Sequence, residues 1–292
     1  MEIPFTKMHA LGNNYVYVDL FQYYMEEESM SGIAKAMADV HRGIGSDGMI
    51  LIHPSDKADV GMRIFNKDGS EGKSCGNGLR CTAKYAFENG IVSKPTFQIE
   101  TKANIVQAEV FPNEGIVDYV TINMGEPILQ RAAIPMLGDA TEAVISEDYL
   151  VEDQSLKVTA VSMGNPHAVF FVEDIKDAPL YELGPVIEKD TRFPEGVNVE
   201  FIQVISEKEL HFRVWERGSG ITQACGTGAC AAVVAAALNG RVSRQEDVTV
   251  HLQGGDLVIN WAENGEVWMS GEARTVASGL FYYGREQIVE SS

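Results

Sequence analysis

Two short stretches of the chain place a cysteine directly before a glycine-rich turn. Cys75 begins the sequence CGNG and Cys225 begins the sequence CGTG. The run from Ala229 to Leu238 is uncharged and has no polar face, which predicts a buried helix from Cys225 to Asn239. A thiol in the first turn of such a helix lies near free backbone N–H groups and the positive end of the helix dipole, and both favour a thiolate. One such cysteine would be interpreted as a packing residue, but the repetition indicates chemistry.

Two thiols of this kind could act as an acid and a base on a single carbon atom. One thiolate would remove a proton from one face of the carbon, and the opposite thiol would return a proton to the other face. The backbone N–H groups of Gly76, Asn77, Gly226 and Thr227 would bind a carboxylate next to that carbon and stabilise the developing charge. The residues therefore indicate inversion of configuration beside a carboxylate, without a cofactor.

The chain carries an internal duplication. Cys75 and Cys225 are 150 residues apart, and Asn13 and Asn165 are 152 residues apart. We therefore predict two similar halves, each with strands around one central helix that begins at a cysteine. Residues 1–125 would form the half that carries Cys75 and residues 126–279 the half that carries Cys225. Ligand sites commonly lie where two domains meet.

Hydrophobic patterning predicts the elements that would position these groups. The helices are expected at 31–41, from 75 to about 90, at 185–190 and at 225–239. Strands are expected near 5–9, 15–20, 49–53, 60–66, 96–100, 105–111 and 116–124 in the first half, and near 158–162, 168–172, 199–205, 210–215, 248–252, 257–261 and 267–269 in the second.

Composition limits the classes of function. The chain has 292 residues, 45% of them hydrophobic, and a formal net charge of −19, which argues against nucleic acid or an anionic membrane as a partner. No apolar run reaches transmembrane length and the first residues lack a signal-peptide pattern, so we expect a cytoplasmic protein. The cysteines at 75, 81, 225 and 230 form no Cys-x-x-Cys pair, so we expect neither structural disulfides nor a metal site. Cys81 and Cys230 are interpreted as packing residues.

The chain resembles the diaminopimelate epimerase family over nearly its full length. The resemblance implies an α+β fold of two pseudo-symmetric domains, each a mixed β-sheet rolled into a barrel around a central apolar helix. It also implies that a C-terminal strand at 280–287 returns to the first domain, which would then include 280–292. The stretches that carry the resemblance are Lys7–Asn13, Phe65–Glu71, Cys75–Cys81, Gly164–His167 and Glu216–Ala229.

The resemblance implies an isomerase that interconverts LL- and meso-diaminopimelate, in the biosynthesis of lysine and peptidoglycan precursors. Such an enzyme needs a small-molecule substrate and no cofactor or metal, and a homodimer is expected. Cys75 and Cys225 match the acid–base pair, and His167 and Glu216 match further catalytic positions. Substrate-binding positions are matched by Asn13, Asn66, Asn165 and Asn198, and by Glu216 and Arg217, which would contact the ammonium and carboxylate groups.

Other interpretations of these residues remain open. Asn13 and Asn165 could be turn residues, His167 could be a core histidine, and Glu216 and Arg217 could form an ordinary ion pair. The protein could also be a proline racemase-like enzyme, a thiol oxidoreductase, or an amino-acid-binding protein without catalysis. The absence of Cys-x-x-Cys counts against the oxidoreductase. The chain departs from the family pattern at Asn14, Tyr15, Gly48, Ile221 and Glu272.

Overall fold

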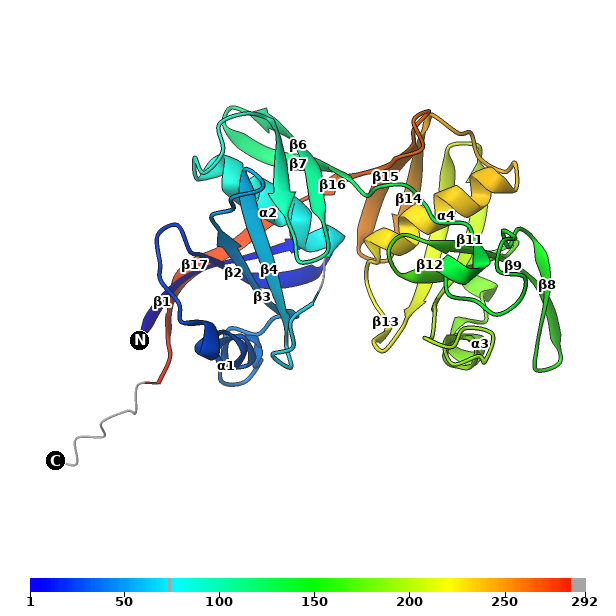
Figure 1. The fold of residues 1–292 in the computed structure, drawn as a ribbon, viewed down its shortest axis with the longest axis horizontal. Coiled ribbons are helices and arrows are strands. Elements are labelled where there is room, and N and C mark those ends of the chain that lie inside the picture. The colour runs from blue at the N-terminus through cyan, green and yellow to red at the C-terminus, as the bar shows by residue number, and fades with distance from the viewer. Residues whose placement is uncertain (73–74, 285–292) are drawn as a thin grey trace. The chain divides into compact units, whose positions relative to one another are not determined.

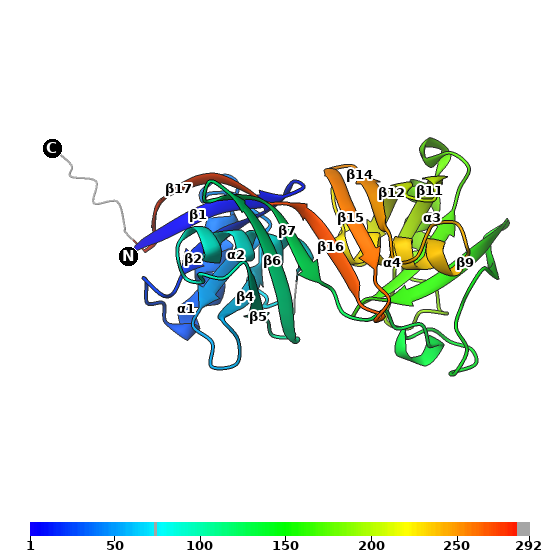
Figure 2. The same ribbon diagram turned by 90° about the horizontal axis from the view of Figure 1, so that it is seen from above.

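The computed structural model describes residues 1–72 and 75–284, and the chain forms two compact units (Figure 1; Figure 2). Unit 1 contains Met1–Val120 and the described residues from Glu272 onward, and unit 2 contains Thr121–Gly271. The sequence-based boundaries, at 125/126 and 279/280, lie a few residues C-terminal to these positions.

In unit 1, the chain alternates strands with two helices. The elements are β1 (Glu2–Ala10), β2 (Asn13–Asp19), α1 (Glu27–Ala38), β3 (Gly48–His53), β4 (Val60–Asn66), α2 (Gly76–Glu88), β5 (Thr96–Glu100), β6 (Ile105–Asn113), β7 (Ile116–Asn123) and β17 (Arg274–Tyr282). β7 extends a few residues past the division between the units.

In unit 2, the order of elements is similar. The elements are η1 (Arg131–Ala133), β8 (Glu147–Val151), β9 (Gln154–Ser162), β10 (Pro166–Phe171), η2 (Ile175–Asp177), α3 (Leu180–Glu188), β11 (Asn198–Ser206), β12 (Glu209–Glu216), β13 (Gly220–Ile221), α4 (Gly226–Leu238), β14 (Asp247–Leu252), β15 (Gly255–Trp261) and β16 (Val267–Glu272). β16 ends one residue past the division.

The two units share one strand order. In unit 1, β1 and β2 are antiparallel, β2 and β3 parallel, β3 and β4 antiparallel, β4 and β5 parallel, and β5 and β6 antiparallel. Strands β9, β10, β11, β12, β14 and β15 repeat this order in unit 2. Parallel neighbours need a crossover, which helices α1 and α2 supply in unit 1 and α3 and α4 in unit 2. The predicted duplication is therefore confirmed by the strand pairing.

Helix α4 passes through the interior of unit 2. It contacts β9, β10, β11, β12, β14 and β15 (Figure 1), and its residues from Gly228 to Ala236 are all buried. The sequence predicted this burial because the helix has no polar face. In the part of the chain that the structure describes, no helix is long and apolar enough to cross a membrane.

Helix α2 holds the same place in unit 1 but is less apolar. It buries Arg80 completely and Lys84 almost completely. The Arg80 guanidinium donates to the Glu272 carbonyl, and Lys84 Nζ donates to the Val117 carbonyl at 2.6 Å and to Glu88 at 2.7 Å. These bonds replace the water that a buried cation loses.

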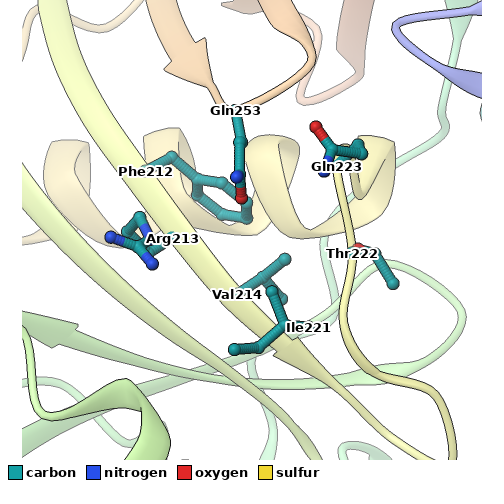
Figure 3. Close-up of a pocket in the computed structure, with 7 residues that line it drawn as sticks. All are labelled: Phe212, Arg213, Val214, Ile221, Thr222, Gln223 and Gln253. Atoms are coloured by element: carbon teal, nitrogen blue, oxygen red, sulfur yellow. The ribbon is translucent and has the colours of Figure 1, made fainter.

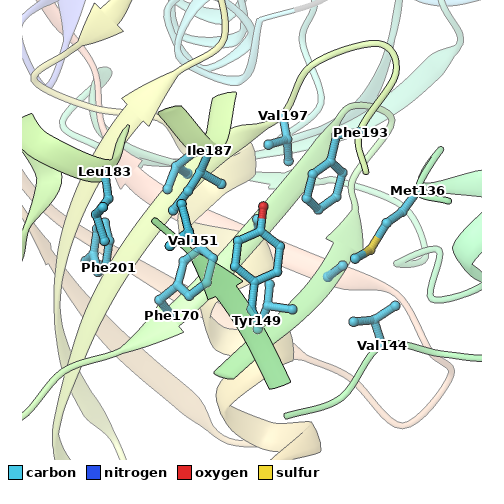
Figure 4. Packing of buried hydrophobic residues seen from close by; sticks show 14 of the residues in the cluster. Met136, Val144, Tyr149, Val151, Phe170, Leu183, Ile187, Phe193, Val197 and Phe201 are labelled. Atoms are coloured by element: carbon cyan, nitrogen blue, oxygen red, sulfur yellow. The ribbon is translucent and has the colours of Figure 1, made fainter. Parts of the chain in front are cut away.

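Aromatic side chains form the core on the outer side of the unit 2 sheet (Figure 4). Phe170 lies between Tyr149, in an edge-on contact with centroids 5.4 Å apart, and Phe201, in a stacked contact at 5.5 Å. Leu183 and Ile187 of α3 belong to the same cluster, so the crossover helix is held on the sheet by apolar burial.

Four expectations about the elements were wrong. Helix α1 spans Glu27–Ala38 and not 31–41. Helix α3 begins at Leu180, five residues before Pro185, which lies inside the helix and not at its first position. Strand β8, which supplies Tyr149, was not predicted at all. The C-terminal strand, β17, returns to unit 1 as expected and pairs antiparallel with β1, but it begins at Arg274 and not at 280. Its small and polar first residues gave no strand pattern, and 285–287 lie outside the described residues.

We predict that Phe201→Ala lowers the free energy of unfolding by about 3–5 kcal/mol, because it opens a cavity in this core. Phe111→Ala is the control, since Phe111 is 54% exposed in β6, and surface changes typically stay within about 0.5 kcal/mol. Denaturant titration of both variants measures the difference. Equal losses would show that Phe201 is not part of a close-packed core.

Candidate active site

Cys75 occupies the N-cap of α2, in extended backbone with φ −151°. Its sulfur accepts a hydrogen bond from the Gly78 N–H at 3.5 Å and lies 3.6 Å from Asn13 Oδ1, to which the thiol donates. Asn77 Nδ2 also donates to Asn13 Oδ1, at 3.2 Å. The start of β2 and the start of α2 are thereby brought together at the thiol.

Asp47 fixes the orientation of Asn13. Its carboxylate accepts from Asn13 Nδ2 at 2.9 Å and from the Asn14 N–H at 2.8 Å. The Asn13 amide must therefore present its oxygen toward Cys75. The sharp turn before it is formed by Leu11 and Gly12, both with positive φ, so Asn13 is the first residue of a strand. Sequence analysis missed Asp47, although its place in a glycine-rich loop was a usable signal.

Tyr15, one of the departures from the family pattern, also reaches Cys75 with its hydroxyl. Burial and the neighbouring thiol raise the pKa of Tyr15 well above its usual value, so its hydroxyl stays protonated and can donate to sulfur. Asn66 lies at the exposed end of β4, where its amide donates to Ser70 Oγ at 3.0 Å in the loop that precedes Cys75.

Cys225 is the N-cap of α4 and is only 5% exposed. Its sulfur lies 3.6 Å from Thr227 Oγ1 and is hydrogen-bonded to the Glu216 carboxyl group. Thr222, in the segment between β13 and α4, donates its hydroxyl to the same carboxyl group. The last residue of β12 and the first turn of α4 are therefore joined at this thiol.

His167 is completely buried on β10 behind the first turn of α4. Its Nδ1 atom lies 2.6 Å from Glu200 Oε1 on the neighbouring strand β11, and its Nε2 atom lies 3.0 Å from Asn165 Oδ1. Asn165 Nδ2 in turn donates to Thr227 Oγ1 at 3.3 Å. Glu200 was missed by sequence analysis, because an acidic residue within an apolar strand carries no spacing signal.

Asn198 and Arg217 are held together at the same end of β12 as Glu216, where β11 begins. Asn198 Nδ2 donates to the Pro166 carbonyl at 2.9 Å, and its Oδ1 accepts from the Arg217 N–H at 2.9 Å. The Arg217 guanidinium donates to the Glu195 carbonyl at 2.9 Å. Since the Glu216 carboxyl group bonds Thr222 and Cys225 instead, the described residues give no ion pair between Glu216 and Arg217.

Comparison with known proteins decides the family. The family model described as diaminopimelate epimerase matches residues 5–130 and 159–276. A diaminopimelate epimerase from Oceanobacillus iheyensis is 65% identical over 98% of this chain and 100% of its own length, and one from Bacillus subtilis is 60% identical over 95% and 98%. The chain belongs to the diaminopimelate epimerase family.

Solved structures with low sequence identity show the same fold. A phenazine biosynthesis protein of the PhzF family from Bacillus anthracis matches with a TM-score of 0.68 at 19% identity, over 96% of this chain and 99% of its own. A hydroxyproline epimerase from Agrobacterium vitis matches with a TM-score of 0.67 at 14% identity, over 96% and 90%. The two-domain fold expected for the diaminopimelate epimerase family is therefore confirmed.

The surroundings of Cys225 act against the thiolate that its helix end favours. Burial raises the pKa of the Cys225 thiol well above its ordinary value, and the Glu216 and Glu200 carboxyl groups raise it further. The Thr227 hydroxyl and the Gly228 N–H act in the opposite direction but are outweighed. Burial also raises the pKa values of both carboxyl groups. Sequence analysis included the effect of the helix end, but it could not show how completely burial removes water from the Cys225 thiol.

Two further observations concern ligands. A small pocket on unit 2 reaches Thr222 but contains no sequence-predicted site residue (Figure 3). The pocket is lined by Phe212, Arg213, Val214, Ile221, Thr222, Gln223 and Gln253.

Within residues 1–72 and 75–284, no three His, Cys, Asp or Glu side chains are grouped so that they could hold a metal ion.

We predict that iodoacetamide alkylates Cys225 with a half-maximal rate above pH 9, because only the thiolate reacts and the pKa of this buried thiol is raised. Peptide mapping by mass spectrometry across a pH series measures the rate at each cysteine. A half-maximal rate below pH 8 at Cys225 would contradict the assigned burial and carboxyl neighbours.

Proposed function

We propose that this protein interconverts LL- and meso-diaminopimelate by proton transfer at the α-carbon, with Cys75 and Cys225 as the acid–base pair. Membership of the diaminopimelate epimerase family makes it an isomerase. One observation supports the assignment of the two cysteines above others. Both buried central helices begin with a cysteine as their N-cap, and both sulfurs lie among polar groups.

The reaction balances without an added reactant. A thiolate takes the α-hydrogen as a proton and becomes a thiol, and the electron pair of the broken C–H bond is delocalised into the neighbouring carboxylate. The second thiol then gives its proton to the opposite face of the carbon and becomes a thiolate. Each turnover exchanges the roles of the two cysteines, so the pair titrates as a coupled unit. The mechanism requires that the sulfurs approach opposite faces of the carbon.

The carboxylate beside the reacting carbon needs donors that are in place before the charge develops. The N–H groups of Gly76, Asn77, Gly226 and Thr227 are in the first turns of α2 and α4, where helix dipoles favour an anion. Asn13 beside Cys75 and Asn165 beside Thr227 add neutral donors and acceptors at these helix ends. Asn66 and Asn198 are proposed as further substrate contacts.

Arg217 and Glu216 support a substrate with a second ammonium and carboxylate pair. The Arg217 fork is bonded through Nη1 to a backbone carbonyl, which leaves further N–H groups for a carboxylate. Proline has no second charged end, so this arrangement favours diaminopimelate over a proline-like substrate. The likeness to a hydroxyproline epimerase is a likeness of fold.

We also propose a cytoplasmic homodimer. Its four cysteines are free thiols, which suits a reducing compartment. Strand β17 exposes Val276, Leu280 and Tyr282, each at least half exposed, and these side chains support contact with a second copy. Sedimentation analysis tests the dimer, and a monomer at all concentrations would contradict it.

We predict that Cys75→Ala and Cys225→Ala each abolish epimerisation of diaminopimelate, because each removes one of the two proton carriers. Cys230→Ala is the control, because Cys230 is a fully buried residue of the same helix as Cys225 and is interpreted as packing. Activity is compared at equal folded concentration. Near-full activity of a folded Cys75 or Cys225 variant would refute the two-base mechanism.

We predict that Arg217→Lys lowers kcat/KM even though the positive charge is kept. Lysine cannot offer the planar fork that binds a carboxylate through two N–H groups. Loss of one charge-assisted contact in a closed site costs about 2–4 kcal/mol of transition-state stabilisation. Steady-state kinetics on diaminopimelate measure it, and an unchanged kcat/KM would remove Arg217 from the substrate contacts.

A further inference from the structure

The interior of unit 2 contains an acidic residue that the two-cysteine chemistry does not use. Glu200 and His167 are both 0% exposed, and they lie on adjacent parallel strands, β11 and β10. Glu200 Oε1 and His167 Nδ1 are 2.6 Å apart. A buried carboxyl group is costly unless it is neutral or hydrogen-bonded, and the second oxygen, Oε2, has no hydrogen-bond partner among the described residues. Packing of the sheet alone does not explain an acid at this position.

Asn165 determines which atom donates and which accepts in each hydrogen bond between Glu200 and Cys225. Its Oδ1 atom can only accept, so His167 Nε2, 3.0 Å away, carries a hydrogen. His167 Nδ1 and Glu200 therefore share one proton, and the pair is neutral overall whichever atom holds it. With this tautomer fixed, the Asn165 amide points its Nδ2 atom to Thr227 Oγ1 at 3.3 Å. The Thr227 oxygen accepts that bond, so its own hydrogen is free for Cys225 Sγ, 3.6 Å away.

A glycine allows the carboxyl group to come this close to the helix. A Cβ atom at Gly228 would lie 3.0 Å from Glu200 Oε1 and 3.2 Å from Cys225 Sγ. The carboxyl group and the sulfur therefore both lie close to the same point in the first turn of α4. Glu200 is placed to act on the first turn of the helix that carries the thiol.

We propose that Glu200 is a positioning residue for the reaction at Cys225. Its hydrogen bond fixes His167 as the Nε2–H tautomer, and this orients Asn165 and Thr227 so that a hydroxyl donates to the sulfur when it is a thiolate. Without Glu200, His167 can carry its hydrogen on Nδ1 instead of Nε2. The Asn165 side-chain amide can then flip, so that its oxygen faces Thr227. The Thr227 hydroxyl then donates to Asn165 and no longer to the sulfur. The role in catalysis rests on the proposed function, but the effect on the sulfur does not.

The test compares Glu200→Gln with Glu200→Leu. The glutamine amide can donate to Nδ1 and keep the tautomer, whereas leucine fills similar space without a hydrogen bond. Glu200→Gln should keep kcat/KM within about threefold, and Glu200→Leu should lower it roughly 10–100-fold, as removal of an orienting partner commonly does. Both substitutions remove a carboxyl group that raises the pKa of Cys225, so the two variants are compared with each other. The pH at which Cys225 is half-maximally alkylated should be higher in the leucine variant, in which the Thr227 hydroxyl is no longer oriented, than in the glutamine variant.

The chain offers a matched control. His251 Nε2 lies 2.8 Å from Glu209 in a second, part-exposed histidine–carboxylate pair of the same unit. Glu209→Gln and Glu209→Leu should alter neither kcat/KM nor alkylation of Cys225. The proposal is overturned if folded Glu200→Leu matches Glu200→Gln in both kcat/KM and the alkylation profile of Cys225.

Two further measurements separate the possible failures. If Glu200→Leu does not fold, ¹⁵N NMR of histidine-labelled wild-type protein still reports the tautomer, with the His167 signals identified by their loss in His167→Gln. A neutral His167 ring with its hydrogen on Nδ1 and none on Nε2 would overturn the proposal. If the wild-type protein has no epimerase activity, the proposed function fails, whereas alkylation of Cys225 still tests the link to Glu200.

Discussion

A helix that begins inside a protein has backbone N–H groups that need partners. Both central helices of this chain begin in that way, and both use a cysteine as the N-cap. At Cys75, the sulfur accepts the Gly78 N–H, as a serine or aspartate oxygen would in a common N-cap. The glycines that follow keep the first turn open, so that strands and side chains can approach. The burial of α2 and α4 therefore fixes the positions of both thiols, and the surrounding sheets serve to bury these helices.

The two units repeat one topology but surround their thiols with opposite chemistry. Near Cys75, Arg80 Nη2 donates to Asn77 at 2.7 Å, and the neighbours are amides and a tyrosine hydroxyl. Near Cys225, the neighbours are two buried carboxyl groups and a histidine. In the proposed two-base mechanism one cysteine holds the proton at rest, and the carboxyl groups that raise the pKa of Cys225 favour it as that member. A duplicated scaffold can thus serve an asymmetric reaction cycle.

The sequence was most informative where the signal was local. The apolar run in α4, the glycines after each cysteine and the constant spacing between the halves predicted the central helices, the start of each helix at a cysteine, and the duplication. Sequence analysis failed where contacts between residues far apart in the chain determine the local structure. Strand β8 exists because Tyr149 packs against Phe170, and α3 continues through Pro185 because Leu183 and Ile187 are buried on the sheet. Glu200 and Asp47 act through partners more than 30 residues away, which no spacing rule reveals.

The two-base mechanism is tested most directly by the uptake of solvent deuterium at the α-carbon before the reaction reaches equilibrium. The protein is incubated with LL-diaminopimelate in D₂O and sampled before equilibrium, and mass spectrometry follows the hydrogen at each α-carbon. Two separate proton carriers predict that meso product contains deuterium at the inverted carbon, while unreacted LL substrate keeps its hydrogen. Meso product that retains the original hydrogen, or LL substrate that takes up deuterium as fast as product forms, would mean that one group moves the proton on both faces.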